Sequence, residues 1–195
     1  PFAGKVGELY APSRDQEKAK EYLATALSEL GCTVDDLSAH LSIDCGDSPT
    51  SIAEASFYQE QWRQVLGIEV AVNSMITKQG SQNRKTGNYV MSITGWGPDY
   101  NDPNTFLDMW VTDGGNNQTG FSNERYDELI DLAAKETDLE KRESYFIECE
   151  QIIADQLPIG PSFWRAPSYA CSDKIKGGMH RSTFQDINAV YVKLS

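Results

Sequence analysis

Residues 48–94 read SPTSIAEASFYQEQWRQVLGIEVAVNSMITKQGSQNRKTGNYVMSIT, and their pattern decides the predicted fold class. Ser48 followed by Pro49 is typical of a helix start, because a Ser side chain caps free backbone N–H groups and Pro fits the first turn. One face of this helix carries the residues Ala55, Tyr58, Trp62, Val65 and Leu66. Gly67 is a common kind of residue just past a helix end. We therefore expect an amphipathic helix between Ser48 and Gly67.

Strand and helix signals continue to alternate through the rest of this stretch. A strand is expected over 68–72, where apolar residues recur at every second position. A polar helical run follows from about 76 to 85 and ends at Gly87. The run YVMSIT at 89–94 is rich in strand-forming residues and is expected to be a buried strand.

The residues before this stretch show the same alternation. Ser13 and Gln16 form a capping-box pattern, which predicts a helix that ends at Gly31. A strand is expected over 39–43, where Ala39, Leu41 and Ile43 alternate with polar residues. Three successive helix–strand pairs favour an α/β fold, with a mixed but mostly parallel sheet flanked by helices.

Helical patterns dominate the chain after residue 102. Residues 102–103 predict the start of a short helix, residues 123–135 predict an amphipathic helix, and Thr137 with Glu140 forms a capping box for another. The core-facing residues of the two longer helices are Tyr126, Leu129, Ile130, Ala133 and Ala134, and then Tyr145, Phe146, Cys149, Ile152 and Ile153. Short strands are expected over 158–164, 169–172 and 189–194. No linker-like break is visible, so a single domain over 1–195 is expected.

Composition and charge exclude several classes of partner. The 195 residues are 39% hydrophobic and 24% charged, as expected for a folded globular chain. The net charge of −12 disfavours nucleic acid and anionic membrane surfaces, both of which select Lys and Arg. The chain begins at Pro1 without a signal-peptide pattern, which is compatible with a cytoplasmic protein. The missing initiator Met favours a mature product or a piece of a longer chain instead.

Motifs for cofactor and metal chemistry are absent from the sequence. No Cys-x-x-Cys, nucleotide-binding loop, dinucleotide fingerprint or serine-hydrolase elbow is present, and the two histidines belong to no metal motif. No cofactor is therefore expected. The cysteines Cys32, Cys45, Cys149 and Cys171 are compatible with four structural thiols or with one disulfide.

The loop after the third expected strand concentrates residues suited to ligand binding. Residues 95–104 read GWGPDYNDPN, and ligands of α/β sheets bind at the carboxyl ends of strands. Trp96 and Tyr100 offer flat contact surfaces, and Asp99 offers a negative charge for an ammonium group. The alternative is structural: Trp96 belongs to the core and Asp99 caps a turn or the following helix.

A carboxylate-dependent hydrolase is a further alternative. Such an enzyme needs two acids that face each other across a cleft. The sequence supplies Asp99, Asp102, Asp108 and Asp113 without indicating which of them pair.

The order of motifs resembles the C-terminal lobe of the bacterial extracellular solute-binding proteins that serve oligopeptide and dipeptide ABC transporters. The segments that carry the resemblance are DQEKAKEYLATAL, SIAEASFYQEQWRQVLGIEVAVNSM, NRKTGNYVMSITGWGPDYNDPNTFLDMW and GGNNQTGFSNERYDELIDLAAKETDLEKRESYFIECEQIIADQLPIGPSFW. The most specific element is GW-x-x-DY-x-DP followed by NN-x-T. The resemblance implies one lobe of a type II periplasmic-binding-protein-like fold, within a longer two-lobed protein.

The resemblance also implies roles for individual residues. Asp99 would pair with the α-ammonium of a bound peptide, and Trp96 would pack on that peptide. Arg84 matches a position that meets a peptide carboxylate in some members. Ligand contacts are further expected from Gly95, Gly97, Pro98, Tyr100, Gln118 and Thr119. Thr77 and Ile93 stand where some members carry Trp and Arg, so contacts to the peptide's side chains or to its C-terminus are expected to differ.

The function implied is binding rather than catalysis. A short peptide would be held outside the cytoplasm, in the periplasm or at the surface on a lipid anchor, and passed to the membrane permease of an ABC transporter. The N-terminal lobe of the same chain would supply the other wall of the cleft. The intact Asp99 favours a peptide amine over an oligosaccharide, a nickel complex or haem, which other members bind.

Overall fold

The chain folds into two units that adjoin in sequence at Gly95 and Trp96. The computed structural model describes residues 3–7, 9, 15–164, 171–177, 180–181, 187–188 and 193. The sheet unit runs from Glu8 to Gly95, and the helical unit comprises Pro1–Gly7 with Trp96–Ser195. That the whole chain is one lobe of a longer protein stays a prediction.

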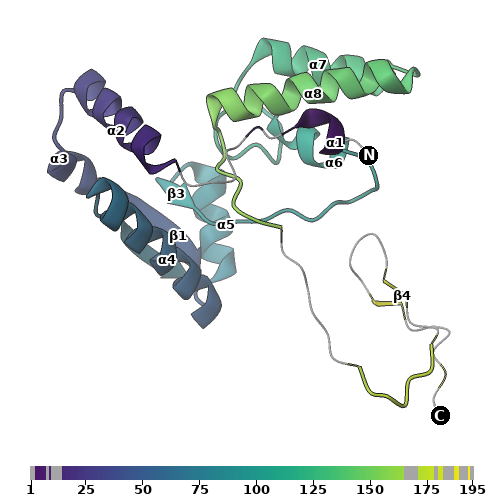
Figure 1. Ribbon diagram of the computed structural model, residues 1–195, viewed down its shortest axis with the longest axis horizontal. Coiled ribbons are helices and arrows are strands. Elements are labelled where there is room, and N and C mark those ends of the chain that lie inside the picture. The colour runs from purple at the N-terminus through teal and green to yellow at the C-terminus, as the bar shows by residue number, and fades with distance from the viewer. Residues whose placement is uncertain are drawn as a thin grey trace. The chain divides into compact units, whose positions relative to one another are not determined.

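A three-stranded parallel sheet forms the centre of the sheet unit (Figure 1). Strand β1 (Ser42–Gly46) lies between β2 (Ala71–Met75) and β3 (Met91–Ser92), and both neighbours run parallel to it. In the register, Ile43 lies opposite Val72 on one side and Met91 on the other. The parallel α/β architecture predicted from the alternation is therefore confirmed.

Four helices accompany this sheet, and three of them end at the predicted glycine, Gly31, Gly67 or Gly87. They are α2 (Gln16–Leu30), α3 (Val34–Ser38), α4 (Pro49–Leu66) and α5 (Thr77–Thr86). Ser48 caps α4 by accepting the N–H of Ser51, and Gly67 ends α4 with φ 70°. Gly87 ends α5 with φ 69°, a left-handed conformation that glycine adopts at little cost.

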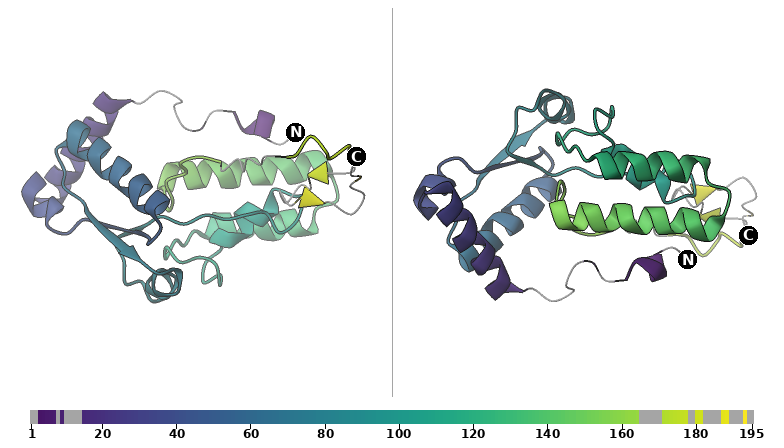
Figure 2. Two further views of the ribbon diagram at one scale, coloured as in Figure 1. Left: turned by 90° about the horizontal axis from the view of Figure 1, so that it is seen from below. Right: turned by 90° about the horizontal axis from the view of Figure 1, so that it is seen from above.

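The alternation of side chains along β1 separates an apolar face from a polar one. Ile43 and Cys45 are buried in a cluster with Ala55 of α4, while Asp44 bonds to α5 on the other face. Helices α4 and α5 accordingly lie on opposite faces of the sheet (Figure 2). One face of β1 is thus core, and the other is available for polar chemistry.

The helical unit is built around two long antiparallel helices. Its elements are α1 (Ala3–Val6), α6 (Asn104–Leu107), a 3₁₀ turn η1 (Asp108–Trp110), α7 (Glu124–Lys135), α8 (Leu139–Gln156), β4 (His180–Arg181) and β5 (Ile187–Asn188). Helices α7 and α8 lie side by side (Figures 1 and 2). Their shared core contains Leu107, Tyr126, Leu129, Ile130, Ala133, Phe146, Cys149 and Ile153. Ala134, which was also predicted to face the core, is exposed.

Several element boundaries differ from prediction because short polar residues cap the chain locally. Asp15 rather than Ser13 caps α2, since its carboxylate accepts the N–H of Lys18 at 3.0 Å; Ser13 itself lies outside the described residues. Similarly, Asp138 rather than Thr137 caps α8. The strand predicted from Ala39 begins only at Ser42, because a capping box at Thr33 starts the unpredicted helix α3.

The remaining strands were predicted too long or in the wrong place. The strand predicted over 68–72 occupies Ala71–Met75, and that over 89–94 is confined to Met91–Ser92, which is half-buried. Residues 158–164 and 171–172 form no strand. Prolines in 158–164 lack the N–H that a strand ladder needs. Residues 169–170 and all of 189–194 except residue 193 lie outside the described residues.

Two further findings concern the state of the cysteines and the length and polarity of the helices. Cys32, Cys45, Cys149 and Cys171 are all free thiols, so the single-disulfide alternative is not formed. Every helix in the described part of the chain is too short or too polar to cross a membrane.

Candidate functional site

Asp99 presents an exposed carboxylate on the loop that precedes α6. Its backbone N–H donates to Thr105 Oγ1 at 2.9 Å, and the Thr105 side chain is buried. The Asp99 side chain is exposed and accepts no hydrogen bond from the described residues. The buried threonine therefore anchors the loop backbone and leaves the Asp99 charge available to a partner.

In the structural alternative, Asp99 would cap a turn or the following helix. The structure gives the role of holding the turn to Asp102 instead. Its Oδ1 accepts the N–H of Asn104, two residues on, at 2.9 Å, which closes an Asx turn just before α6. Arg142 of α8 also donates to both carboxylate oxygens, at 2.6 and 3.0 Å, and donates through Nε to the carbonyl of Ala133. This bidentate ion pair, together with the bond to Ala133, connects the loop to α7 and α8.

The bonding of Asp102 also bears on the hydrolase alternative. The hydrogen bond from Arg142 lowers the pKa of Asp102, so this carboxyl stays ionised and is unsuited to donate a proton as a general acid. Asp108 is likewise engaged, because its Oδ2 accepts from Tyr100 Oη and Asn104 Nδ2, both at 3.1 Å. These two acids therefore hold the loop together.

Two aromatic rings belong to the same loop as Asp99. The Trp96 and Tyr100 side chains are 39% and 40% exposed, so neither is a core residue. The Tyr100 hydroxyl donates to Asp108 and accepts from Asn104 Nδ2 at 2.9 Å, and partial burial raises its pKa. The hydroxyl is thus fixed while part of the ring remains open to contact.

The two glycines of the loop are not required by packing. A Cβ atom added at Gly95 or Gly97 would meet no heavy atom within 4 Å, and Pro98 between Gly97 and Asp99 is half-buried. Open space beside both glycines is compatible with close approach of a ligand backbone.

The predicted contacts Gln118 and Thr119 lie on a loop organised by Asn117. Asn117 Nδ2 donates to the carbonyls of Val111 and Phe121 at 3.0 and 2.7 Å. The Thr119 hydroxyl donates to Asn117 Oδ1 at 3.0 Å and accepts the N–H of Phe121. The Thr119 hydroxyl is therefore engaged in hydrogen bonds within the loop, so a ligand would contact the Thr119 backbone instead. Gln118 is half-buried. The Asn-x-Thr spacing is the signal that could have identified Asn117 as the organiser.

Arg84 belongs to α5 of the sheet unit, whereas Trp96, Asp99 and Tyr100 belong to the helical unit. Arg84 is half-buried, and its Nη1 donates to Ser92 Oγ at 3.3 Å. Arg84 is therefore bound to the sheet, contrary to the simple alternative of a surface arginine.

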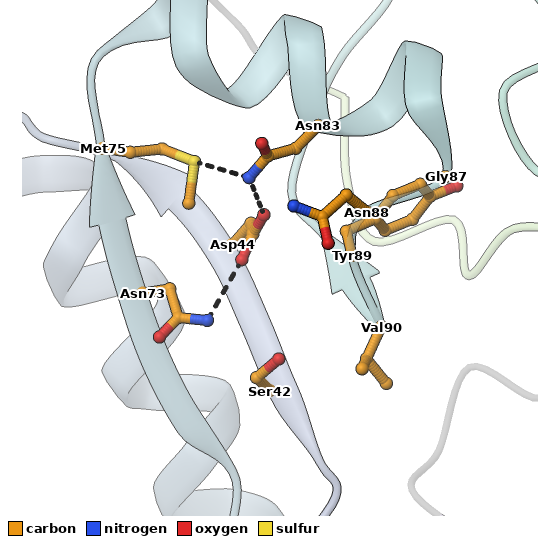
Figure 3. Close-up of a pocket in the computed structure, with 9 residues that line it drawn as sticks. All are labelled: Ser42, Asp44, Asn73, Met75, Asn83, Gly87, Asn88, Tyr89 and Val90. Carbon is orange, nitrogen blue, oxygen red and sulfur yellow. Dashed lines mark hydrogen bonds between the residues drawn. The ribbon is translucent and has the colours of Figure 1, made fainter.

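The sheet unit contains a polar pocket that sequence reasoning missed (Figure 3). The pocket has a volume of about 420 Å³ and is lined by Ser42, Asp44, Asn73, Met75, Asn83, Gly87, Asn88, Tyr89 and Val90. Asp44 is only 4% exposed. The signal was present, since a charged residue stands between Ile43 and Cys45 in a buried strand. No cluster of metal-ligating residues occurs in the part of the chain that the structure describes.

Comparisons with known proteins identify the family. Residues 2–118 match the family model described as bacterial extracellular solute-binding proteins, family 5 Middle. The oligopeptide-binding protein OppA of Bacillus subtilis is 33% identical over 178 residues, which are 87% of this chain and 31% of OppA. A probable deoxycholate-binding periplasmic protein of Escherichia coli, YgiS, is 31% identical over 116 residues, 60% of this chain and 21% of its own length. The chain thus spans about a third or less of these relatives.

The fold agrees with a solved structure of the same kind. Listeria monocytogenes OppA bound to peptide superposes with a TM-score of 0.77 at 29% identity, over 93% of this chain and 34% of that one. The family-model match covers more than half of the chain, so the chain belongs to the bacterial extracellular solute-binding proteins, family 5.

Proposed function

We propose that this chain is one lobe of a protein that binds short peptides outside the cytoplasm and delivers them to an ABC-transporter permease. The similarity to OppA of Bacillus subtilis and to the peptide-bound OppA of Listeria monocytogenes supports this proposal. The remainder of the longer protein supplies the second lobe. The protein resides in the periplasm or is lipid-anchored at the cell surface.

The exposed carboxylate of Asp99, which has no partner among the described residues, is the observation that carries the proposal. A peptide α-ammonium is the partner that best fits a single anchored carboxylate beside aromatic surfaces. Trp96 and Tyr100 line the peptide, and the backbone near Gly95, Gly97 and Pro98 runs along it. Gln118 and Thr119 contribute from the second loop, and Arg84 receives a peptide carboxylate.

The proposed action is binding without bond-making. Closure of two lobes buries the ligand and strengthens a charge pair that water would otherwise weaken. Contacts to the peptide main chain provide affinity with little selection among side chains. No acid–base pair is needed, which agrees with the engagement of Asp102 by Arg142.

Asp99→Asn in the full-length protein tests the assignment. The substitution keeps the shape of the side chain but removes its charge, so peptides with free N-termini should bind about 100-fold more weakly, as expected for loss of a desolvated charge pair. Titration calorimetry with a tripeptide and its N-acetylated form measures the effect. In the unaltered protein, the N-acetylated form should bind poorly.

Asp131→Asn is the matched control. Asp131 lies on α7, is exposed and pairs with Lys135 of the same helix at 3.7 Å, so Asp131→Asn removes the same charge outside the 95–104 loop. The role of Asp99 is refuted if both variants bind the tripeptide equally well. It is also refuted if N-acetylation leaves the affinity of the unaltered protein unchanged.

A second candidate function is binding of a different solute on the same fold. The match to the probable deoxycholate-binding protein YgiS favours this alternative, because it extends over 60% of the chain. Mass spectrometry of small molecules that co-purify with the full-length protein distinguishes the two. Short peptides with free N-termini support peptide transport, whereas a sterol-like, sugar or metal-complex ligand supports the alternative.

A further inference from the structure

Thr105 connects the loop that carries Asp99 to the interior of the helical unit. The residue is only 2% exposed, and its Oγ1 accepts the backbone N–H of Asp99 at 2.9 Å. A hydrogen bond to a buried group is stronger than one in water, and a β-branched side chain has few rotamers to choose from. Thr105 therefore gives the backbone of Asp99 a fixed point of attachment.

The short helix α6, which carries Thr105, is held at both of its ends. Just before the helix, Arg142 of α8 donates to both carboxylate oxygens of Asp102. At its end, the carbonyl of Leu107 accepts the buried hydroxyl of Tyr126 of α7 at 2.6 Å. The two long helices of this unit thus fix the position of Thr105.

The residues that lead into Asp99 do not fix its position by themselves. Gly95 and Gly97 are exposed, and a Cβ atom added at either would meet no heavy atom within 4 Å. Glycine has the widest choice of backbone conformations. The bond to Thr105 accordingly restrains the backbone at the residue whose charge the proposed function uses.

We propose that Thr105 is a positioning residue that sets the preference of this site for a free peptide α-ammonium, a role that rests on the function proposed above for Asp99. A hydrogen bond between an ammonium and a carboxylate needs its heavy atoms about 2.7–2.9 Å apart, so a small displacement of the carboxylate weakens it. Thr105 acts on the ligand through Asp99. Ligands without an α-ammonium should therefore be insensitive to Thr105.

Trialanine and its N-acetylated form, titrated into the full-length protein by calorimetry, test the proposal. Thr105→Val keeps the size of the side chain but leaves the Asp99 N–H without its acceptor, so trialanine should bind about tenfold more weakly. N-acetyl-trialanine should bind as it does to the unaltered protein, because it has no α-ammonium to pair with Asp99. The preference for the free amine should fall by the same factor.

Two variants that differ by the hydroxyl keep the result interpretable if Thr105→Val does not fold. Thr105→Ser and Thr105→Ala both lose the buried methyl group, so both should unfold at a lower temperature than the unaltered protein. Thr105→Ser keeps the acceptor for the Asp99 N–H. Trialanine should therefore bind Thr105→Ala about tenfold more weakly than Thr105→Ser.

A double-mutant cycle with Asp99→Asn separates positioning from a general effect on the fold. If Thr105 acts through the Asp99 carboxylate, Thr105→Val should cause little further loss of trialanine affinity in a protein that already carries Asp99→Asn. Thr25→Val is the control, because it removes a hydroxyl that donates to the carbonyl of Glu21 within α2. It should leave the affinity for both peptides unchanged.

The outcomes separate this proposal from the one on which it rests. Additive losses in the cycle overturn the role of Thr105, and so does equal binding of trialanine by Thr105→Ser and Thr105→Ala. Either result leaves the peptide-binding function in place as long as Asp99→Asn alone weakens binding. If Asp99→Asn has no effect, the assignment of Asp99 and the role of Thr105 fail together.

Discussion

Asp99 and Asp102 stand three residues apart in one loop, yet their surroundings give them different tasks. Asp102 is held by Arg142 and by the N–H of Asn104, and all of these bonds lie within the helical unit. Among the described residues, Asp99 is held through its backbone, by Thr105. Because Asp102 and Thr105 fix the loop, its shape does not depend on the Asp99 side chain.

The Asp102–Arg142 pair should make stability depend on pH. The pKa of Asp102 is lowered in the folded state, so the pair stabilises the fold fully above the ordinary value of 3.8 and loses its effect as pH falls through the lower, folded pKa. Asp102→Asn should lower the free energy of unfolding by about 1–3 kcal/mol at pH 7. Urea unfolding of the unaltered protein and of Asp102→Asn, each at pH 7 and pH 3, measures the difference in unfolding free energy between the two proteins. If that difference is as large at pH 3 as at pH 7, the prediction is contradicted.

The four thiols should differ in reactivity. Burial raises the pKa of Cys45, and raises that of Cys149 to about 12, so little thiolate forms at either position at pH 8. Cys171 is exposed and should react first with a chromogenic disulfide, with Cys45 and Cys149 protected until unfolding. Cys171→Ser should remove the fastest phase. Equal rates at all four positions in the native state would refute this ordering.

At the scale of elements, the pairing of α7 with α8 supports the candidate loop. The buried Tyr126 hydroxyl of α7 donates to the carbonyl of Leu107 at the end of α6, at 2.6 Å. Arg142 of α8 reaches the other side of the same segment through Asp102, and its guanidinium lies 4.6 Å from the centre of the Phe146 ring. The two helices therefore position the loop between Asp99 and Leu107.

Leu129→Ala tests how much the packing of α7 against α8 contributes to the free energy of unfolding. Leu129 is fully buried between α7 and α8, so its truncation should cost about 2–5 kcal/mol of unfolding free energy. Leu132→Ala on the same helix is the matched control, because that side chain is 36% exposed and should cost much less. Thermal and urea unfolding compare the two. Equal losses would mean that the described core does not stabilise α7.

At the scale of the whole molecule, the chain represents about a third of a relative such as OppA of Bacillus subtilis. A binding cleft between two lobes needs both of its walls, because enclosure removes water from the charge pair. The net charge of −12 adds no attraction for nucleic acid and keeps the surface well solvated. The proposed affinity is consequently a property of the full-length protein.

The isolated 195-residue chain should therefore bind tripeptides at least tenfold more weakly than the full-length protein. The loss follows from the missing wall, which would leave the Asp99 charge pair in water. Calorimetry on both proteins with the same peptide measures the ratio. Equal affinities would show that this lobe contains the complete site and would contradict the two-lobed proposal.

The sequence by itself determined the family and the existence of helices α2, α4, α5, α7 and α8, because these depend on local signals. Ser48-Pro49, Gly67 and Gly87 act through their own backbone preferences, which hold in almost any surroundings. The amphipathic stripes of α7 and α8 predicted the buried residues Phe146 and Cys149 for the same reason. The loop at 95–104 was recognisable from its composition.

Only the tertiary structure decided which acids of that loop are engaged and where the buried charge lies. Asp102 meets Arg142 across 40 residues of sequence, and Asp44 meets Asn83 across 39, so no local pattern reports either contact. The extent of β3 depended equally on its partner, since a strand ends where hydrogen bonds to its neighbour end. Contacts between distant residues form only when the chain is folded, and they assign different tasks to carboxylates that look alike in sequence.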